Sequence, residues 1–163
     1  MNMDGFWSLI DECRGETDGC EALADSVVKR LSTLPRAEVA AFIRLFDELL
    51  DRAYRWDLWG AAYIINGGCS DDGFEYFRCW LIAQGKDTFE RALADPESLA
   101  DVAEPDVECE DLLYAGGRAW EAVAGQSRRP DRYAPYPPEP AGRPWTEDEL
   151  DARFPRLTAA FGE

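Results

Sequence analysis

Residues 35–53 read PRAEVAAFIRLFDELLDRA and contain the clearest helical pattern in the chain. A helix accepts Pro35 in its first turn, where the backbone N–H has no intrahelical partner to lose. Apolar side chains then recur at steps of three and four residues: Val39, Phe42, Ile43, Phe46, Leu49, Leu50 and Ala53. Charged side chains occupy the opposite face. This spacing predicts a long amphipathic helix with one buried face.

The segments around this helix also predict helices. Before it, helical spacing covers about 4–13 and 18–34, with Asp4 as the expected first cap. After it, residues 58–65 are apolar on nearly all sides, which is typical of a helix buried on most of its surface. The sequence Asn66-Gly67-Gly68 is expected to end that helix, because Asn and Gly adopt the left-handed conformation readily. Ser70 is expected to cap the next one.

The C-terminal part changes character. Short helices are predicted after Asp87 and Asp95, and a longer one over about 106–124, where two adjacent glycines form a weak point that would bend or break it. Residues 127–145 are rich in proline and predict an extended strap, which either wraps the helical body or hangs as a loose tail. Residues 146–149 have the capping-box pattern of a last short helix.

We therefore expect an all-α fold without strands. The predicted architecture is an irregular multi-helix bundle over residues 1–125. Residues 126–163 are expected to form the Pro-rich C-terminal strap and the terminal helix, packed on the bundle or tethered to it. The chain is expected to be a monomer or a homodimer.

Charge limits the partners that this chain is expected to have. Its net charge is −16, from 33 acidic and 17 basic residues. A field of this sign repels phosphate backbones and anionic lipids, so we expect no nucleic-acid and no membrane partner. No apolar run approaches the roughly 20 residues that span a bilayer. The first residues lack the features of a signal peptide, so a cytoplasmic location is expected.

The chain has no histidine and has five cysteines. Without histidine, Ser-His-Asp and Cys-His catalysis and the histidine-based zinc motifs are excluded. The odd number of cysteines, without a CxxC pair or a signal peptide, predicts reduced thiols that mostly serve as small core residues. Their spacing does not support a zinc site. We expect no cofactor, and the absence of a catalytic set favours a protein that is not an enzyme.

A central block of unusual sequence identifies a family resemblance. Residues 53–63 read AYRWDLWGAAY, residues 66–72 read NGGCSDD and residues 74–82 read FEYFRCWLI, and the chain begins with FWSLI at 6–10. Together these stretches resemble the uncharacterised "domain of unknown function 4240" family, common in actinobacteria, over roughly residues 4–102. The resemblance implies a helical domain of the bacterial cytoplasm, and it implies no particular activity, cofactor or partner.

The turn over residues 66–72 is the first candidate site. It joins two helix ends and gathers small residues, the Cys69 thiol and the carboxylates of Asp71 and Asp72. Asp71 and Glu75 stand four residues apart on one helical face, so one reading of the turn is a cation site formed by these carboxylates. The structural alternative is a tight turn in which Ser70 caps a helix and the two aspartates complement the helix dipole.

A second candidate is a polar and aromatic set around Arg78. Its spacing from Phe74 and Phe77 predicts that Arg78 points partly inward, where it would need a carboxylate from Asp57, Asp71 or Asp72. Such a set either lines a pocket for a small polar molecule or forms an internal salt-bridge network. Cys69 precedes a helix start, but nearby carboxylates would raise the pKa of its thiol and no histidine is present to act as base.

These features favour a non-catalytic binding or protein-interaction module. Its partner would be a protein or a small polar ligand, recognised through Trp56, Asp57, Asn66, Cys69, Asp71, Asp72 and Arg78. The alternative is a carboxylate- or metal-dependent enzyme that uses the turn over residues 66–72. A further possibility is a partner for cationic proteins, bound through the acidic surface and therefore sensitive to salt.

Overall fold

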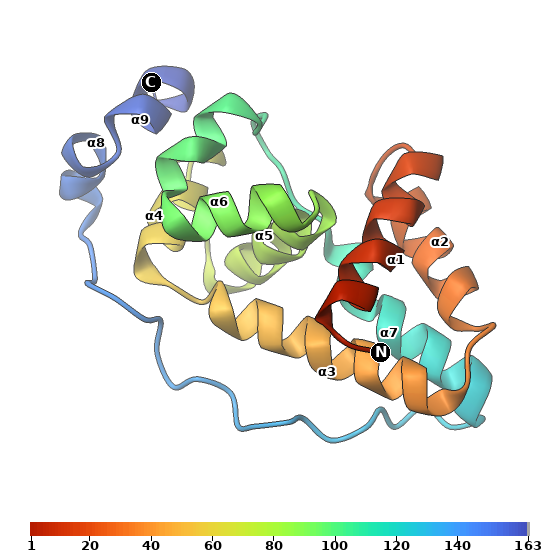
Figure 1. Cartoon of the computed structure of the whole chain (residues 1–163). Helices are drawn as coiled ribbons and strands as arrows, with labels where there is room; N and C mark the ends of the chain where they lie inside the picture. The colour runs from red at the N-terminus through yellow and green to blue at the C-terminus, as the bar shows by residue number, and fades with distance from the viewer. Residues whose placement is uncertain (163) are drawn as a thin grey trace.

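Helix α3 (Arg36–Arg52) runs along one side of the molecule in the computed structural model, which describes residues 1–162 (Figure 1). It starts directly after Pro35, and its buried face includes Val39, Phe42 and Leu49. The described residues are all helical apart from their connections and contain no strand, which confirms the predicted all-α class. The amphipathic pattern of residues 35–53 therefore marks a helix that packs along the core.

The other elements follow in the order α1 (Met3–Glu16), α2 (Cys20–Leu31), α4 (Trp56–Ile65), α5 (Asp71–Ala83), α6 (Lys86–Ala94), the 3-10 helix η1 (Pro96–Asp101), α7 (Glu110–Ala124), the 3-10 helix η2 (Glu147–Glu149), α8 (Leu150–Arg153) and α9 (Pro155–Phe161). Asn2, and not Asp4, caps the first helix, because its side-chain oxygen accepts from the N–H of Gly5 at 2.9 Å. Helix α4 is buried on most sides, as its apolar sequence predicts.

Helix α7 lies at the centre of the packing and touches α2, α3 and α5. It begins at Glu110 rather than near residue 106, because Asp106 has a positive φ of 61° and therefore lies outside any helix. Gly116 and Gly117 do not break this helix, since α7 continues through both. A Cβ at Gly116 would stand 2.8 Å from Cγ1 of Ile43, so this glycine lets α7 approach α3 closely.

The cysteines differ from the expectation of five reduced thiols. Cys20 and Cys109 form a disulfide that joins the starts of α2 and α7 across 89 residues of sequence. Cys13, Cys69 and Cys79 are free, and the first and last of these are buried as expected of core thiols. The spacing of cysteines along a chain carries no information about such a distant pair, which explains the error. Disulfides are typical of oxidising compartments, so this bond does not support the expected cytoplasmic location. That location stays a prediction.

The Pro-rich strap follows the helical body instead of hanging loose, and it runs past α3 toward α4 (Figure 1). Arg129 pairs with the buried carboxylate of Asp47, and Arg132 pairs with Asp51 at 2.5 Å. Further along, the carbonyl of Ala141 accepts from the N–H of Trp56, the first residue of α4, and its N–H donates to the carbonyl of Tyr54 after α3, both at 2.9 Å. The strap therefore joins two helices that are far from it in sequence.

The last segment packs on α4 and η1. It contains η2 and two short α-helices where one short helix was expected. The predicted capping box does not form, because the side chain of Thr146 makes no capping bond. The carboxylate of Glu97 instead accepts from the N–H groups of Arg156 and Leu157 at 3.1 and 2.8 Å, at the start of α9. This anion complements the positive end of a helix.

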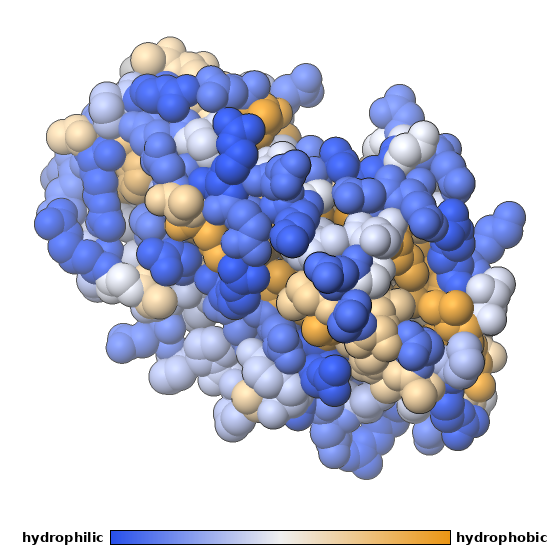
Figure 2. Space-filling model, in the orientation of Figure 1, coloured by the Kyte–Doolittle hydropathy of each residue, from blue (hydrophilic) through white to orange (hydrophobic). Residues whose placement is uncertain are grey.

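The visible surface is largely hydrophilic, as the net charge suggests (Figure 2). Hydrophobic residues show through it in smaller areas, including a group of neighbouring ones at the lower right of the view. Among residues 1–162, no helix combines the length and the apolar character that crossing a bilayer requires.

The two adjacent glycines of α7 supply a matched test of the packing against α3. Gly117→Ala should raise the free energy of unfolding by about 0.5–1 kcal/mol, because its site is open and alanine favours a helix. Gly116→Ala should lower it by about 1–3 kcal/mol, because Ile43 must move. Urea denaturation followed by circular dichroism measures both. Equal shifts in the two variants would show that α7 and α3 are not in close contact.

Loss of the disulfide should lower stability strongly, because it closes a long loop. Replacing Cys20 and Cys109 by Ala should lower the free energy of unfolding by about 2–5 kcal/mol. Reductant should shift the urea midpoint of the natural chain and leave that of the double variant unchanged. A natural chain whose midpoint does not respond to reductant would contradict the pairing.

Candidate functional site

The turn over residues 66–72 has the structure that its sequence predicts. Gly67 and Gly68 have φ of 65° and 120°, and the N–H of Gly68 donates to the carbonyl of Tyr63 at 2.8 Å, which ends α4. Ser70 caps α5, because its Oγ accepts from the N–H of Gly73 at 3.1 Å. The glycines and the serine of this turn therefore have structural tasks.

Asn66 braces a distant loop. Its amide nitrogen donates to the carbonyl of Val107, and its Oδ1 accepts from the N–H of the same residue, both at 3.0 Å. Both hydrogen-bonding ends of the side chain are engaged, so the amide joins the end of α4 to the segment before α7. Asn66 thus acts within the fold and away from the cavity described below.

Trp56 and Asp57 belong to the contact between α4 and the strap. The ring of Trp56 stacks on Trp59 at a centroid distance of 5.4 Å, and Trp145 of the strap packs edge-on against both. Trp145 Nε1 donates to the carbonyl of Trp56 at 2.6 Å. Asp57 lies one residue inside α4, pairs with the neighbouring Arg55 at 3.1 Å and accepts from the N–H of Leu58.

Arg78 is the residue whose environment differs most from the expectation. It is only 7% exposed and lies between two rings, with its guanidinium carbon 4.7 Å from the centroid of Tyr54 and 4.8 Å from that of Phe74. Nη1 donates to the carbonyl of Leu50 at 2.8 Å, near the end of α3. The expected carboxylate partner is absent, because no Asp or Glu among residues 1–162 forms an ion pair with Arg78.

The burial of Arg78 has an electrostatic cost. Removal from water lowers the pKa of its guanidinium, and the nearby carboxylate of Glu75 acts in the opposite direction. A buried charge without a directly bonded counter-charge is unfavourable by several kcal/mol. Stacking on two aromatic faces and the bond to the α3 carbonyl compensate part of this cost. Nη2 donates to no protein acceptor in the described part of the chain, so it has unused capacity.

A cavity of about 220 Å³ opens beside this guanidinium. Three segments build it: the end of α3 with the residues after it, one face of α5, and the strap. Its lining residues are Leu50, Asp51, Tyr54, Asp71, Glu75, Arg78, Arg132, Tyr136 and Pro137. Residues far apart in the sequence thus meet around one polar space.

The charged groups of the cavity fall into two classes. Arg132 is engaged by Asp51 at 2.5 Å and by Asp47 at 3.7 Å, and Tyr133 Oη donates to the same Asp51 carboxylate. Asp71, Glu75 and Arg78 form no ion pair with any residue from 1 to 162. One buried cation and two carboxylates therefore face the cavity without direct counter-charges.

The structure brings only two of the seven candidate residues, Asp71 and Arg78, to this cavity. Asp72 lies next to Asp71 but is exposed and does not line it. Arg132 and Tyr136 of the strap are the members that sequence reasoning missed. The proline-rich composition indicated an extended segment, but no local signal shows which helix such a segment covers.

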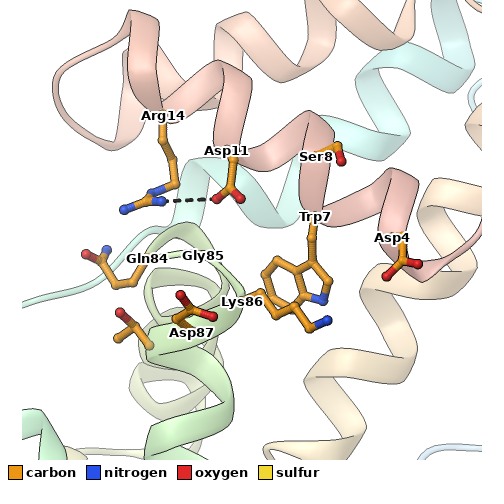
Figure 3. Close-up of a pocket in the computed structure, with 10 residues that line it drawn as sticks. Asp4, Trp7, Ser8, Asp11, Arg14, Gln84, Gly85, Lys86 and Asp87 are labelled. Carbon is orange, nitrogen blue, oxygen red and sulfur yellow. Dashed lines mark hydrogen bonds and ion pairs between the residues drawn. The ribbon is translucent and has the colours of Figure 1, made fainter.

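A larger hollow, of about 610 Å³, lies between α1 and the start of α6 (Figure 3). Its charged lining residues are Asp4, Asp11, Arg14, Lys86 and Asp87, and all of them are exposed. Asp11 already pairs with Arg14 at 3.1 Å. Exposed and mutually compensated charges hold a ligand weakly, because water screens them. Size alone therefore does not make this hollow the better candidate.

The structure adds no support for the metal site considered at residues 66–72. Among residues 1–162, no group of three or more Asp, Glu or Cys side chains is arranged to hold a metal ion. Asp71 and Glu75 share the cavity, whereas Asp72, the third member of the considered cation site, lies outside its lining.

Cys69 should behave as an unreactive thiol. Burial raises its pKa from its ordinary value of 9.0 to about 11, Arg78 acts in the opposite direction, and Asp71 adds to the rise. The direction agrees with the sequence argument, but burial is the main cause rather than the carboxylates. Alkylation by iodoacetamide should therefore keep accelerating about tenfold per pH unit up to pH 11, because only the thiolate reacts. Mass spectrometry of the labelled peptide measures this.

A free peptide that spans residues 66–72 is the control for the Cys69 titration. Its labelling rate should level off near pH 9, since its thiol is fully solvated. The same plateau in the folded chain would contradict a raised pKa.

Comparison with known proteins gives a family and no activity. No curated protein and no solved structure matches the chain. The model of one family, described as "Protein of unknown function (DUF4240)", matches residues 1–122. This match includes α1 to α6 and nearly all of α7, whereas the strap and the last helices lie beyond it. The chain therefore belongs to the DUF4240 family.

Proposed function

We propose that this chain is a non-catalytic binding module that holds a small polar ligand in the cavity between α3, α5 and the strap. The observation that carries the proposal is Arg78. This arginine is only 7% exposed, has no ion-pair partner in the described part of the chain and lines a polar cavity. A ligand that accepts from Nη2 would supply the missing partner and recover the desolvation cost.

The cavity has the composition of a small-molecule site. Its walls combine a few convergent polar groups with the rings of Tyr54 and Tyr136. Its volume of about 220 Å³ is below the range of sites for drug-sized molecules and suits a small metabolite. Tyr136 is 71% exposed and lies 3.8 Å from the Arg132 guanidinium, at the rim. The ring is therefore available to cover a bound molecule.

A non-catalytic role fits the chemistry of these groups. Histidine is absent from the chain, and the thiol nearest the cavity, Cys69, has its pKa raised by burial. A histidine base and a reactive thiol, which many hydrolytic mechanisms use, are therefore missing there, and we assign the cavity carboxylates to recognition. The cavity groups are suited to recognition, because a buried arginine presents fixed donors for a planar acceptor.

Native mass spectrometry of the full chain, purified from bacterial cells and incubated with a small-molecule extract of such cells, tests the proposal. We expect an added mass of small-molecule size that disappears on denaturation. Arg78→Met should reduce its occupancy by about tenfold or more, because a charged hydrogen bond contributes about 1.5–3 kcal/mol.

Two tyrosine variants keep this test independent of folding. Tyr136→Ala removes an exposed ring at the rim of the cavity and should weaken retention several-fold. Tyr114→Ala removes a tyrosine that is 51% exposed on α7 and does not line the cavity, and it should leave retention unchanged. Absence of any added mass, or an added mass that neither Arg78→Met nor Tyr136→Ala reduces, would contradict a ligand site at this place and would favour a protein partner.

A further inference from the structure

The class of ligand follows from the charges on one face of α5. Asp71, Glu75 and Arg78 stand at successive steps of four and three residues, so they project from the same side of the helix. All three line the cavity, and none has an ion-pair partner among residues 1–162. Two carboxylates therefore stand beside one guanidinium along the cavity wall.

A ligand of one charge sign fits this wall poorly. A simple anion would satisfy Arg78 but would lie beside the carboxylates of Asp71 and Glu75, which would repel it. A simple cation would satisfy the carboxylates but would face the guanidinium. The other charged lining groups do not change this balance, because Arg132 and Asp51 already neutralise each other at 2.5 Å.

We propose, on the basis of the binding function above, that the cavity takes a small zwitterion of free amino-acid size. Its carboxylate binds Arg78, and its protonated amine lies between Asp71 and Glu75. Both ends then gain charge-assisted hydrogen bonds, which are stronger than neutral ones. The amine also relieves the repulsion between two like charges four residues apart on a helix.

The arrangement of the other groups supports this orientation. Tyr54 stacks on Arg78 and holds its guanidinium plane, so the donors aimed at a carboxylate have a fixed direction. Asp71 lies in the first turn of α5 and is exposed, so a ligand amine can reach its carboxylate from solvent. Tyr136 at the rim is placed to cover the ligand's remaining atoms.

Titration of the full chain followed by amide chemical shifts tests the class. The probes are each protein amino acid and the series glycine, β-alanine and 4-aminobutyrate, in which the distance between the charges increases. Acetate, propionate, ethylamine and isopropylamine serve as single-charge analogues. We expect at least one zwitterion to bind about tenfold or more tightly than the matching acid and the matching amine, with shifts in residues that line the cavity.

Substitutions in the first turns of α5 supply the matched controls. The double change Asp71→Asn with Glu75→Gln should abolish the preference for a ligand that carries an amine. Propionate should then bind as tightly as alanine, the matching zwitterion. Asp72→Asn changes the same residue type one position along, outside the cavity lining, and should leave both affinities unaltered. Asp71 and Asp72 are exposed, and Glu75 is half-buried and changed only to its amide, so these variants should fold.

The outcomes separate this inference from the function on which it rests. If acetate or propionate binds the natural chain as tightly as any zwitterion, the ligand class is wrong. If no zwitterion binds but mass spectrometry shows a retained ligand that depends on Arg78, the binding function stands and the zwitterion does not. If neither method detects a small molecule, both proposals fail.

Discussion

The acidic face of α3 near its C-terminal end is the constraint around which this molecule is arranged. Asp47 is only 4% exposed on that face, and Asp51 follows it one helical turn later. Burial raises the pKa of Asp47, although Arg129 and Arg132 partly oppose this rise. Carboxylates in such positions need cations, and the strap supplies both arginines. Because the arginines must reach α3, the strap passes over the space between α3 and α5.

The carbonyl groups at the same end of α3 also need hydrogen-bond donors. The last carbonyls of a helix have no intrahelical partner, and Arg78 of α5 donates to one of them, that of Leu50. This bond brings a guanidinium into the interior, where Tyr54 and Phe74 enclose it. The cavity thus lies between the two groups that interact with this end of α3: α5 forms one wall and the strap forms the opposite wall.

Local features of the fold were predictable from the sequence, and distant pairings were not. The amphipathic pattern of α3, the glycine turn after α4 and the Ser70 cap depend on neighbouring residues, so short-range rules predict them. The inward orientation of Arg78 also followed from helical spacing. That Arg78 has no carboxylate partner could not be predicted. Asp57 is engaged by Arg55, and the distances from Arg78 to other acidic residues depend on how the helices pack. The disulfide and the strap contacts likewise join residues that are far apart in sequence.

The division of the cavity between two parts of the chain has an evolutionary consequence. The matched family region, residues 1–122, contains the end of α3 and the face of α5, whereas Arg132, Tyr136 and Pro137 lie beyond it. A shared helical domain that forms one wall of the cavity can be combined with different C-terminal segments that form the opposite wall. Selectivity can then diverge by change in a short extended segment, without disturbance of the helical core. Under the binding function proposed above, homologues with unlike C-terminal segments would recognise different molecules on a common scaffold.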